Sequence, residues 1–233
     1  MKGVMIACDF EGKKELDEFL AKMGDEKPFL KIGMELFYKE GAPLVVELKE
    51  KGYKIFLDLK LHDIPNTVYK AMKNLAKLGV DVTNVHAGGG IEMMKAAKRG
   101  LSEGASGAKL IAVTILTSLD DKALTNELGI KMTANEAVRQ YALNAAAAGL
   151  DGIVCSPYEA PIAKELNLLS VTPGIRLAGD SVGDQKRVAT PSFAKEQGSD
   201  YIVVGRSITG AENPLEAYLK CKREFLGEQR QQV

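Results

Sequence analysis

The sequence has few of the residues that build metal sites and disulfide frameworks. Its 233 residues include three cysteines and two histidines, and Cys8, Cys155 and Cys221 lie far apart with no C-x-x-C pair. A sparse, odd number of cysteines is typical of reduced thiols in a reducing compartment. Because the chain has neither an H-E-x-x-H motif nor a Cys/His cluster, we predict no structural zinc site and no metal.

An excess of charge and a long apolar run are also missing. The chain has 31 Lys and Arg against 31 Asp and Glu, a net charge of +0. Nucleic-acid surfaces carry a basic excess, so we predict no nucleic-acid partner. The first residues, "MKGVMIACDFEGKKELDEFL", contain only a short apolar run before Asp9. This run fits neither a signal peptide nor a membrane span, so we predict a cytoplasmic protein with no membrane partner.

Short apolar runs that alternate with helical stretches dominate the chain. Eight runs predict strands that begin at Gly3, Phe29, Lys54, Asp81, Lys109, Gly152, Leu168 and Tyr201. Between them, helices are predicted over 13–23, 43–51, 67–78, 91–101, 135–148 and 214–225. Repeated strand–helix alternation without a linker predicts the α/β class, as a single-domain (β/α)8 TIM barrel over residues 1–233. The same pattern leaves a doubly wound open sheet as the alternative.

One connection is too long for an ordinary turn. After "VTPGIR" the chain runs through "LAGDSVGDQKRVATPS" before a helix can resume. Long connections of this kind in compact domains are either functional lids or disordered.

The segment "FLDLKLHDIPNTV", residues 56–68, places charges in what begins as a buried strand. Side chains two residues apart share a face of a strand. One face then carries Leu57, Leu59 and Leu61, and the other carries Asp58, Lys60 and His62. Burying ions costs several kcal/mol each unless they are well paired. We therefore predict that this charged face has a function.

Polar residues recur where the predicted strands end, which is where barrel enzymes have their active sites. They are Asp9, Lys31, Asp63, His86, Thr117, Ser118, Pro173, Gly174, Arg176, Gly205 and Arg206. An isolated polar residue of this kind is usually a cap or a surface charge, but recurrence on seven strands predicts an active site. In "VVGRSI", the Gly205–Arg206 pair predicts a phosphate site on which Gln185 could close.

The segment "DLKLHDIPNT" resembles the signature of the orotidine 5′-monophosphate decarboxylase family. The resemblance extends over essentially the whole chain, because "ACDF", "KIGMELFY", "VHAGGG", "VTILTSLD", "VTPGIR", "DQKRVATP" and "VVGRSI" follow in the family's order. It implies a carboxy-lyase that converts orotidine 5′-monophosphate to uridine 5′-monophosphate, the last step of de novo pyrimidine biosynthesis. It also implies that the reaction needs no cofactor.

The resemblance implies a role for each matching residue. Lys60 would be the proton donor within a catalytic charged array of Asp58, Lys60 and Asp63. The substrate-binding residues would be Asp9, Lys31 and Thr67 near the ribose, Thr117 and Ser118 near the pyrimidine, and Arg176, Gln185, Gly205 and Arg206 at the 5′-phosphate. Pro173 would also bind the substrate. The protein would be a homodimer, with Asp63 and Ile64 contributed across the interface.

Two alternative functions stay open. Magnesium-dependent sugar-phosphate lyases share a similar Asp-x-Lys-x-x-Asp strand, although Thr117, Ser118 and the Gln185 loop favour the nucleotide enzyme. A non-catalytic barrel that binds a phosphate ligand is the other alternative.

We interpret His62 as a structural or supporting residue and His86 as a hydrogen-bonding residue at a strand end.

Overall fold

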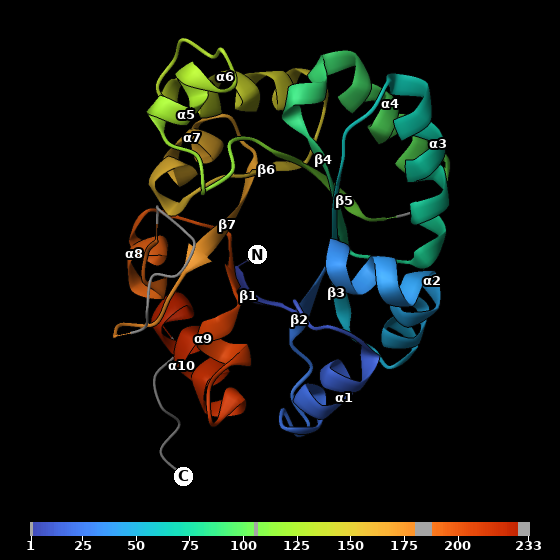
Figure 1. The fold of residues 1–233 in the computed structure, drawn as a ribbon, viewed down its shortest axis with the longest axis vertical. Coiled ribbons are helices and arrows are strands. Elements are labelled where there is room, and N and C mark those ends of the chain that lie inside the picture. The colour runs from blue at the N-terminus through green and yellow to red at the C-terminus, as the bar shows by residue number, and fades with distance from the viewer. Residues whose placement is uncertain (1, 105–106, 180–187, 228–233) are drawn as a thin grey trace.

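Eight parallel strands close into a barrel in the order β1 to β8 (Figure 1). The structure is a computed structural model, and it describes residues 2–104, 107–179 and 188–227. The strands are β1 (Gly3–Ala7), β2 (Phe29–Gly33), β3 (Lys54–Leu61), β4 (Val82–His86), β5 (Lys109–Val113), β6 (Gly152–Val154), β7 (Leu169–Ile175) and β8 (Tyr201–Val204). The pairing of β1 with β8 closes the sheet. The predicted (β/α)8 barrel is therefore confirmed, and the open-sheet alternative is wrong.

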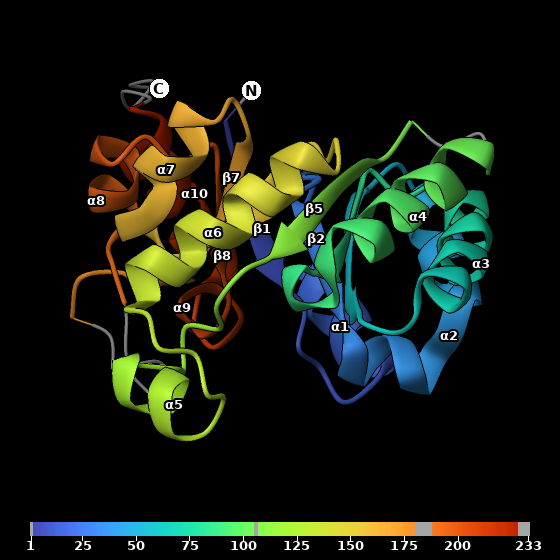
Figure 2. The ribbon, with the colours of Figure 1, turned by 90° about the horizontal axis from the view of Figure 1, so that it is seen from above.

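Helices surround the strands (Figures 1 and 2). They are α1 (Lys13–Ala21), α2 (Met34–Glu50), α3 (Pro65–Leu75), α4 (Gly90–Glu103), α5 (Asp121–Asn126), α6 (Ala134–Ala147), α7 (Ala160–Glu165), α8 (Pro191–Glu196), α9 (Arg206–Thr209) and α10 (Pro214–Leu226). Figure 2 shows α5 at one end of the molecule, opposite the end where the N-terminus lies. None of the helices in the described ranges combines the length and apolarity that a membrane crossing requires.

Glycines end several helices, as the sequence pattern indicates. Gly52, Gly79 and Gly149 have φ angles of 84°, 68° and 74°, a left-handed conformation that glycine adopts without steric cost. The prediction for α2 was wrong at its start, because the helix begins at Met34 rather than at residue 43. Gly41, with φ 71°, interrupts α2 just before Pro43. The apolar pattern in the sequence therefore predicts only the second half of this helix.

The core lies in two layers, inside the barrel and between the strands and helices. The interior contains Met5, Ala7, Phe56, Val82, Ile111, Val171, Tyr201 and Val203. Two larger clusters fill the space between the sheet and the surrounding helices. This packing leaves the carboxyl ends of the strands free to carry polar side chains.

Strand β3 is less regular than the predicted alternation. Leu57 pairs with Thr83 of β4, and Leu61 pairs with Val85. Between these pairs β3 has three residues and β4 has one, so β3 contains two extra residues. Lys60 has φ 51°, a left-handed conformation that costs a non-glycine residue about 1–2 kcal/mol. The strand ends at Leu61, and His62 lies beyond it. The prediction that Asp58 and Lys60 share a face is confirmed, since their side chains form an ion pair of 2.8 Å. His62 does not continue that face, because the strand ends before it.

Candidate active site

A cavity of about 520 Å³ lies at the carboxyl ends of the strands. Ten of the predicted site residues line it: Asp9, Lys31, Asp58, Lys60, Thr117, Ser118, Pro173, Arg176, Gly205 and Arg206. They follow or end six different strands, β1, β2, β3, β5, β7 and β8. The fold thus brings together residues that are up to about 200 positions apart, as expected for the active end of a parallel barrel.

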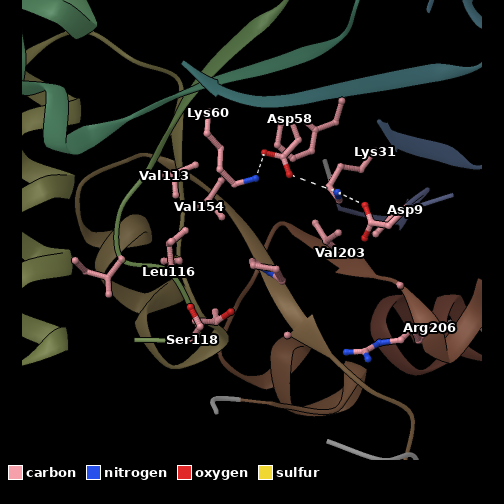
Figure 3. A pocket seen from close by; sticks show the side chains of 18 of the residues that line it. Asp9, Lys31, Asp58, Lys60, Val113, Leu116, Ser118, Val154, Val203 and Arg206 are labelled. Atoms are coloured by element: carbon pink, nitrogen blue, oxygen red, sulfur yellow. Dashed lines mark hydrogen bonds and ion pairs between the residues drawn. The ribbon is translucent and has the colours of Figure 1, made fainter. Parts of the chain in front are cut away.

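Four charged side chains of alternating sign form a row along one side of this cavity (Figure 3). The Lys60 Nζ lies 2.8 Å from Asp58 Oδ1, and the Lys31 Nζ lies 3.4 Å from Asp58 Oδ2. The row ends at Asp9, whose Oδ1 lies 3.2 Å from the Lys31 Nζ. Each ion except those at the two ends therefore has an oppositely charged neighbour on both sides.

The row keeps Asp58 and Lys31 ionised although both side chains are largely buried. Burial alone would raise the pKa of Asp58, but the ammonium groups of Lys31 and Lys60 outweigh it and hold the pKa below the ordinary 3.8. Burial alone would lower the pKa of Lys31, but Asp58 and Asp9 outweigh it and hold the pKa above 10.5. A fixed array of charges beside a cavity is suited to stabilising charge that develops in a reaction.

Asn84 is a residue of this site that the sequence analysis missed. It is fully buried in β4, its Nδ2 donates to Asp58 Oδ1 at 2.6 Å, and its Oδ1 accepts from the Lys60 backbone N–H at 2.8 Å. One signal could have found it: asparagine is depleted in strands, so an asparagine amid the valines of "DVTNVHA" must have a polar partner.

Arginine and small polar residues lie in the rest of the cavity. Arg206 lies apart from the charged row, and Ser118 lies on another side (Figure 3). Arg176 is buried, and its Nη1 donates to the Ile175 carbonyl at 3.0 Å. Two guanidinium groups in one cavity provide forked donors that match a phosphate or a carboxylate.

Apolar side chains form the walls between these polar groups. They come from Ala7, Phe56, Val113, Ile115, Leu116, Val154, Cys155 and Val203. Cys155 is buried, and it belongs to this wall. Cys8 is buried too, and burial raises the pKa of its thiol to about 12, so it stays protonated. Such walls limit water and strengthen the electrostatic interactions of the charged row.

Three predicted site residues do not line this cavity. Asp63, Ile64 and Thr67 are all exposed, and Asp63 Oδ1 accepts a hydrogen bond from the Ile64 N–H at 2.6 Å. Ile64 keeps 67% of its surface exposed, which is high for a large apolar side chain. A fourth predicted residue, Gln185, lies outside the described residues.

The two histidines lie next to one another beside the site. Their rings stack at 5.3 Å, and His86 Nδ1 accepts from the Gly88 N–H at 3.1 Å, which confirms its hydrogen-bonding role. Burial, His62 and Lys60 lower the pKa of His86, so it is neutral around pH 7. In the described part of the chain, no group of three or more His, Cys, Asp or Glu side chains is arranged to hold a metal ion.

A closed parallel barrel with this row of charges at its carboxyl end defines a (β/α)8-barrel enzyme. The chain belongs to the orotidine 5′-phosphate decarboxylase / HUMPS family, whose model matches residues 2–221. The family resemblance stated from the motifs is therefore confirmed, and so is the expectation of a carboxy-lyase.

Full-length relatives carry the same family name. Orotidine 5′-phosphate decarboxylases from Bacillus cytotoxicus and Bacillus anthracis are 56% and 55% identical to the chain over 233 residues, covering 97% of it and 98% of each relative. The crystal structure of the enzyme from Lactobacillus acidophilus matches with a TM-score of 0.86 at 45% identity, covering 97% of this chain and 99% of that one. The enzyme from Methanocaldococcus jannaschii, complexed with the inhibitor BMP, shares the fold with a TM-score of 0.77 at 22% identity, covering 97% and 99%.

Proposed function

We propose that the protein decarboxylates orotidine 5′-monophosphate to uridine 5′-monophosphate without a cofactor, with Lys60 as the proton donor. The observation that carries the proposal is the Asp58–Lys60 ion pair of 2.8 Å at the wall of a cavity that Arg176 and Arg206 also line. The substrate has a carboxylate on its pyrimidine ring and a phosphate on its ribose. An ammonium group and two guanidinium groups in one cavity match that pair of anions.

The chemical step needs a cation at carbon 6 of the pyrimidine. The bond from carbon 6 to the carboxylate breaks, its electron pair stays on carbon 6, and CO2 leaves. The Lys60 ammonium stabilises the developing carbanion and then transfers a proton to it, which forms the new C–H bond. The Lys60 ammonium pairs with Asp58 at 2.8 Å beforehand, and the neutral amine regains a proton from solvent afterwards.

Asp58 would also face the carboxylate that leaves. A negative charge beside another negative charge raises the energy of the bound substrate, and loss of neutral CO2 removes that contact. Lys31 at 3.4 Å and Lys60 at 2.8 Å hold Asp58 in its ionised state. The buried charges therefore serve the reaction at some cost in folding stability.

The remaining cavity residues would bind the rest of the nucleotide, as the family resemblance implies. Asp9 and Lys31 would hydrogen-bond the ribose hydroxyl groups. Thr117 and Ser118 would contact the pyrimidine, and Arg176, Gly205 and Arg206 would hold the 5′-phosphate together with Gln185. Pro173 lines the same cavity and would also bind the substrate.

The site would be completed by a second copy of the chain in a two-fold dimer. Asp63, Ile64 and Thr67 are exposed outside their own chain's cavity, and an interface would cover the apolar Ile64 side chain. In a two-fold dimer the same surface is used twice. Each subunit would then offer Asp63 and Ile64 to the cavity of its partner.

The test is turnover of orotidine 5′-monophosphate by the purified protein after treatment with EDTA, followed by loss of ultraviolet absorbance. We expect full activity without added metal. Activity that disappears with EDTA and returns with Mg²⁺ would support the magnesium-dependent lyases instead. A protein that binds the nucleotide without converting it would support the non-catalytic barrel.

A further inference from the structure

Asn84 lies opposite the irregular part of β3. Between the aligned pairs Leu57↔Thr83 and Leu61↔Val85, β4 provides Asn84 alone where β3 provides residues 58–60. The Asn84 side chain is completely buried. Backbone pairing cannot stay regular where three residues face one, so side-chain hydrogen bonds must help to hold this stretch.

The Asn84 carboxamide closes a small ring of interactions with Asp58 and Lys60. Its Nδ2 donates to Asp58 Oδ1 at 2.6 Å, and its Oδ1 accepts from the Lys60 N–H at 2.8 Å. The same Asp58 Oδ1 accepts from the Lys60 Nζ at 2.8 Å. The orientation of the amide is unambiguous, because a backbone N–H only donates and an ionised carboxylate only accepts.

We propose that Asn84 is a positioning residue for the decarboxylation, acting through Lys60 and Asp58. Its carbonyl oxygen holds Lys60 in the left-handed conformation with φ 51°, and its amide group holds the carboxylate that aligns the Lys60 ammonium. This inference rests on the proposed role of Lys60 as proton donor. A displacement of about 1 Å at a reacting group lowers the rate about a hundredfold, so the alignment of the Lys60 ammonium should have a large effect on kcat.

The first test uses Asn84→Leu and the smaller Asn84→Ser. Neither substitution changes a residue that lines the cavity, so the Kd of uridine 5′-monophosphate should stay within about threefold of the unmodified value while kcat falls by about a hundredfold. Thr83→Val is the matched control. Thr83 is buried in the same strand and donates to the Leu57 carbonyl at 3.1 Å, so this variant loses a hydrogen bond at the same β3–β4 contact and should keep its kcat.

The second test is the pH profile of Asn84→Asp, which has nearly the shape of the original residue. An ionised carboxylate at position 84 still accepts from the Lys60 N–H but repels Asp58 and cannot donate to it. At lower pH one proton is shared between the two carboxyl groups, and the missing hydrogen bond returns. The ratio of variant to unmodified kcat should therefore rise as the pH falls.

The groups that titrate around position 84 come from three strands. Asp58 and Lys60 of β3 contact it directly, and Lys31 of β2 pairs with Asp58. His86 follows two residues later in β4 with His62 stacked on it, and the partner across β5 is the apolar Ile111. Both histidines are present in the unmodified protein and in Asn84→Asp. Their titration therefore cancels in the ratio of the two kcat values.

A merely structural role for Asn84 predicts different results. Asn84→Leu would then keep the kcat of Thr83→Val, or the Asn84→Asp ratio would not change with pH, and either result overturns the inference. If Asn84→Leu fails to fold, the pH dependence of the ratio of Asn84→Asp kcat to unmodified kcat still tests the inference. An active Lys60→Ala variant would defeat the proposed function itself, whereas an inactive Lys60→Ala with fully active Asn84 variants would defeat this inference alone.

Discussion

Lys60 is the residue on which the proposed chemistry depends most. Its ammonium contacts Asp58 at 2.8 Å and lines the cavity. We expect Lys60→Ala to lower kcat at least about a thousandfold, about 4 kcal/mol of transition-state stabilisation, because no other group replaces its proton. The variant should still bind uridine 5′-monophosphate. Single-turnover kinetics and a binding titration measure both quantities.

Lys54→Ala is the matched control, since Lys54 is an exposed lysine at the opposite end of the same strand. It should retain full turnover. If Lys60→Ala keeps more than about a tenth of the unmodified rate, less than about 1.4 kcal/mol is lost and Lys60 is not the proton donor.

Asp58 links the charged row to stability as well as to catalysis. Its pKa is lowered below the ordinary 3.8 by Lys31 and Lys60 in spite of burial. A lowered pKa in the folded state adds stability that is complete above pH 3.8 and is lost as the pH falls toward the folded-state pKa. Asp58→Asn should therefore lower the free energy of unfolding by about 3 kcal/mol at pH 7, because two ammonium groups lose their partner.

Denaturant unfolding of both proteins between pH 7 and pH 3 checks this prediction. The difference in free energy of unfolding should shrink below pH 3.8, because the Asp58 carboxylate takes up a proton in the unfolded state there while the folded state still keeps it ionised. A difference that is constant across this range would mean that the charge of Asp58 does not contribute to folding.

Helix α9 follows β8 after Gly205 and begins with Arg206, which lines the cavity. We expect Arg206→Ala to lower kcat/KM for orotidine 5′-monophosphate by about a hundredfold or more, because a charge-assisted phosphate contact is lost. Turnover of the bare nucleoside orotidine should hardly change. Gln185→Ala should act in the same direction.

Steady-state kinetics with both substrates provide the measurement. Arg139→Ala is a suitable control, since Arg139 pairs with Glu165 on the exposed surface. An equal loss with nucleotide and nucleoside would exclude Arg206 from phosphate binding.

The contact between α3 and α4 depends on a glycine. A Cβ atom at Gly100 would lie 2.3 Å from the Tyr69 carbonyl oxygen, which is backbone and cannot turn aside. Alanine in place of glycine stabilises a helix by about 1 kcal/mol, but overpacking lowers the free energy of unfolding by about 1–3 kcal/mol. We expect Gly100→Ala to lower Tm by a few degrees in a thermal melt.

Gly107→Ala is the comparison, because nothing lies within 4 Å of its Cβ position. Its Tm should stay unchanged. A Gly100→Ala variant as stable as the unmodified protein would show that α3 and α4 can separate at no cost.

At the scale of the whole molecule, the proposed dimer predicts complementation. Each site would combine Lys60 of one subunit with Asp63 of the other, so Lys60→Ala and Asp63→Ala proteins should both be nearly inactive. In a mixed dimer one site receives both substitutions and the other receives neither. Random exchange makes about half of the dimers mixed, so about a quarter of the unmodified activity should return.

Native mass spectrometry checks the exchange, and a turnover assay measures the activity. Unmixed samples of each variant, treated in the same way, are the controls. Activity that stays at the parental level after confirmed exchange would mean that Asp63 acts within its own subunit.

Patterns along the sequence predicted the eight strands, the longer helices and most of the residues that line the cavity. Strand starts at Lys54 and Tyr201 and helix ends at Gly52 and Gly79 depend on neighbours along the chain, so local patterns predict them. Short helices such as α9 were missed because four residues carry no periodicity.

Three features could not be read from the sequence: the irregular turn at Lys60, the burial of Asn84, and the exposure of Asp63, Ile64 and Thr67. These properties depend on how β3 pairs with β4, whose partners are about 26 residues apart in sequence. Whether a polar side chain finds a partner or faces solvent depends on the register between strands. No local pattern of residues contains that register, because it is set when the closed barrel packs.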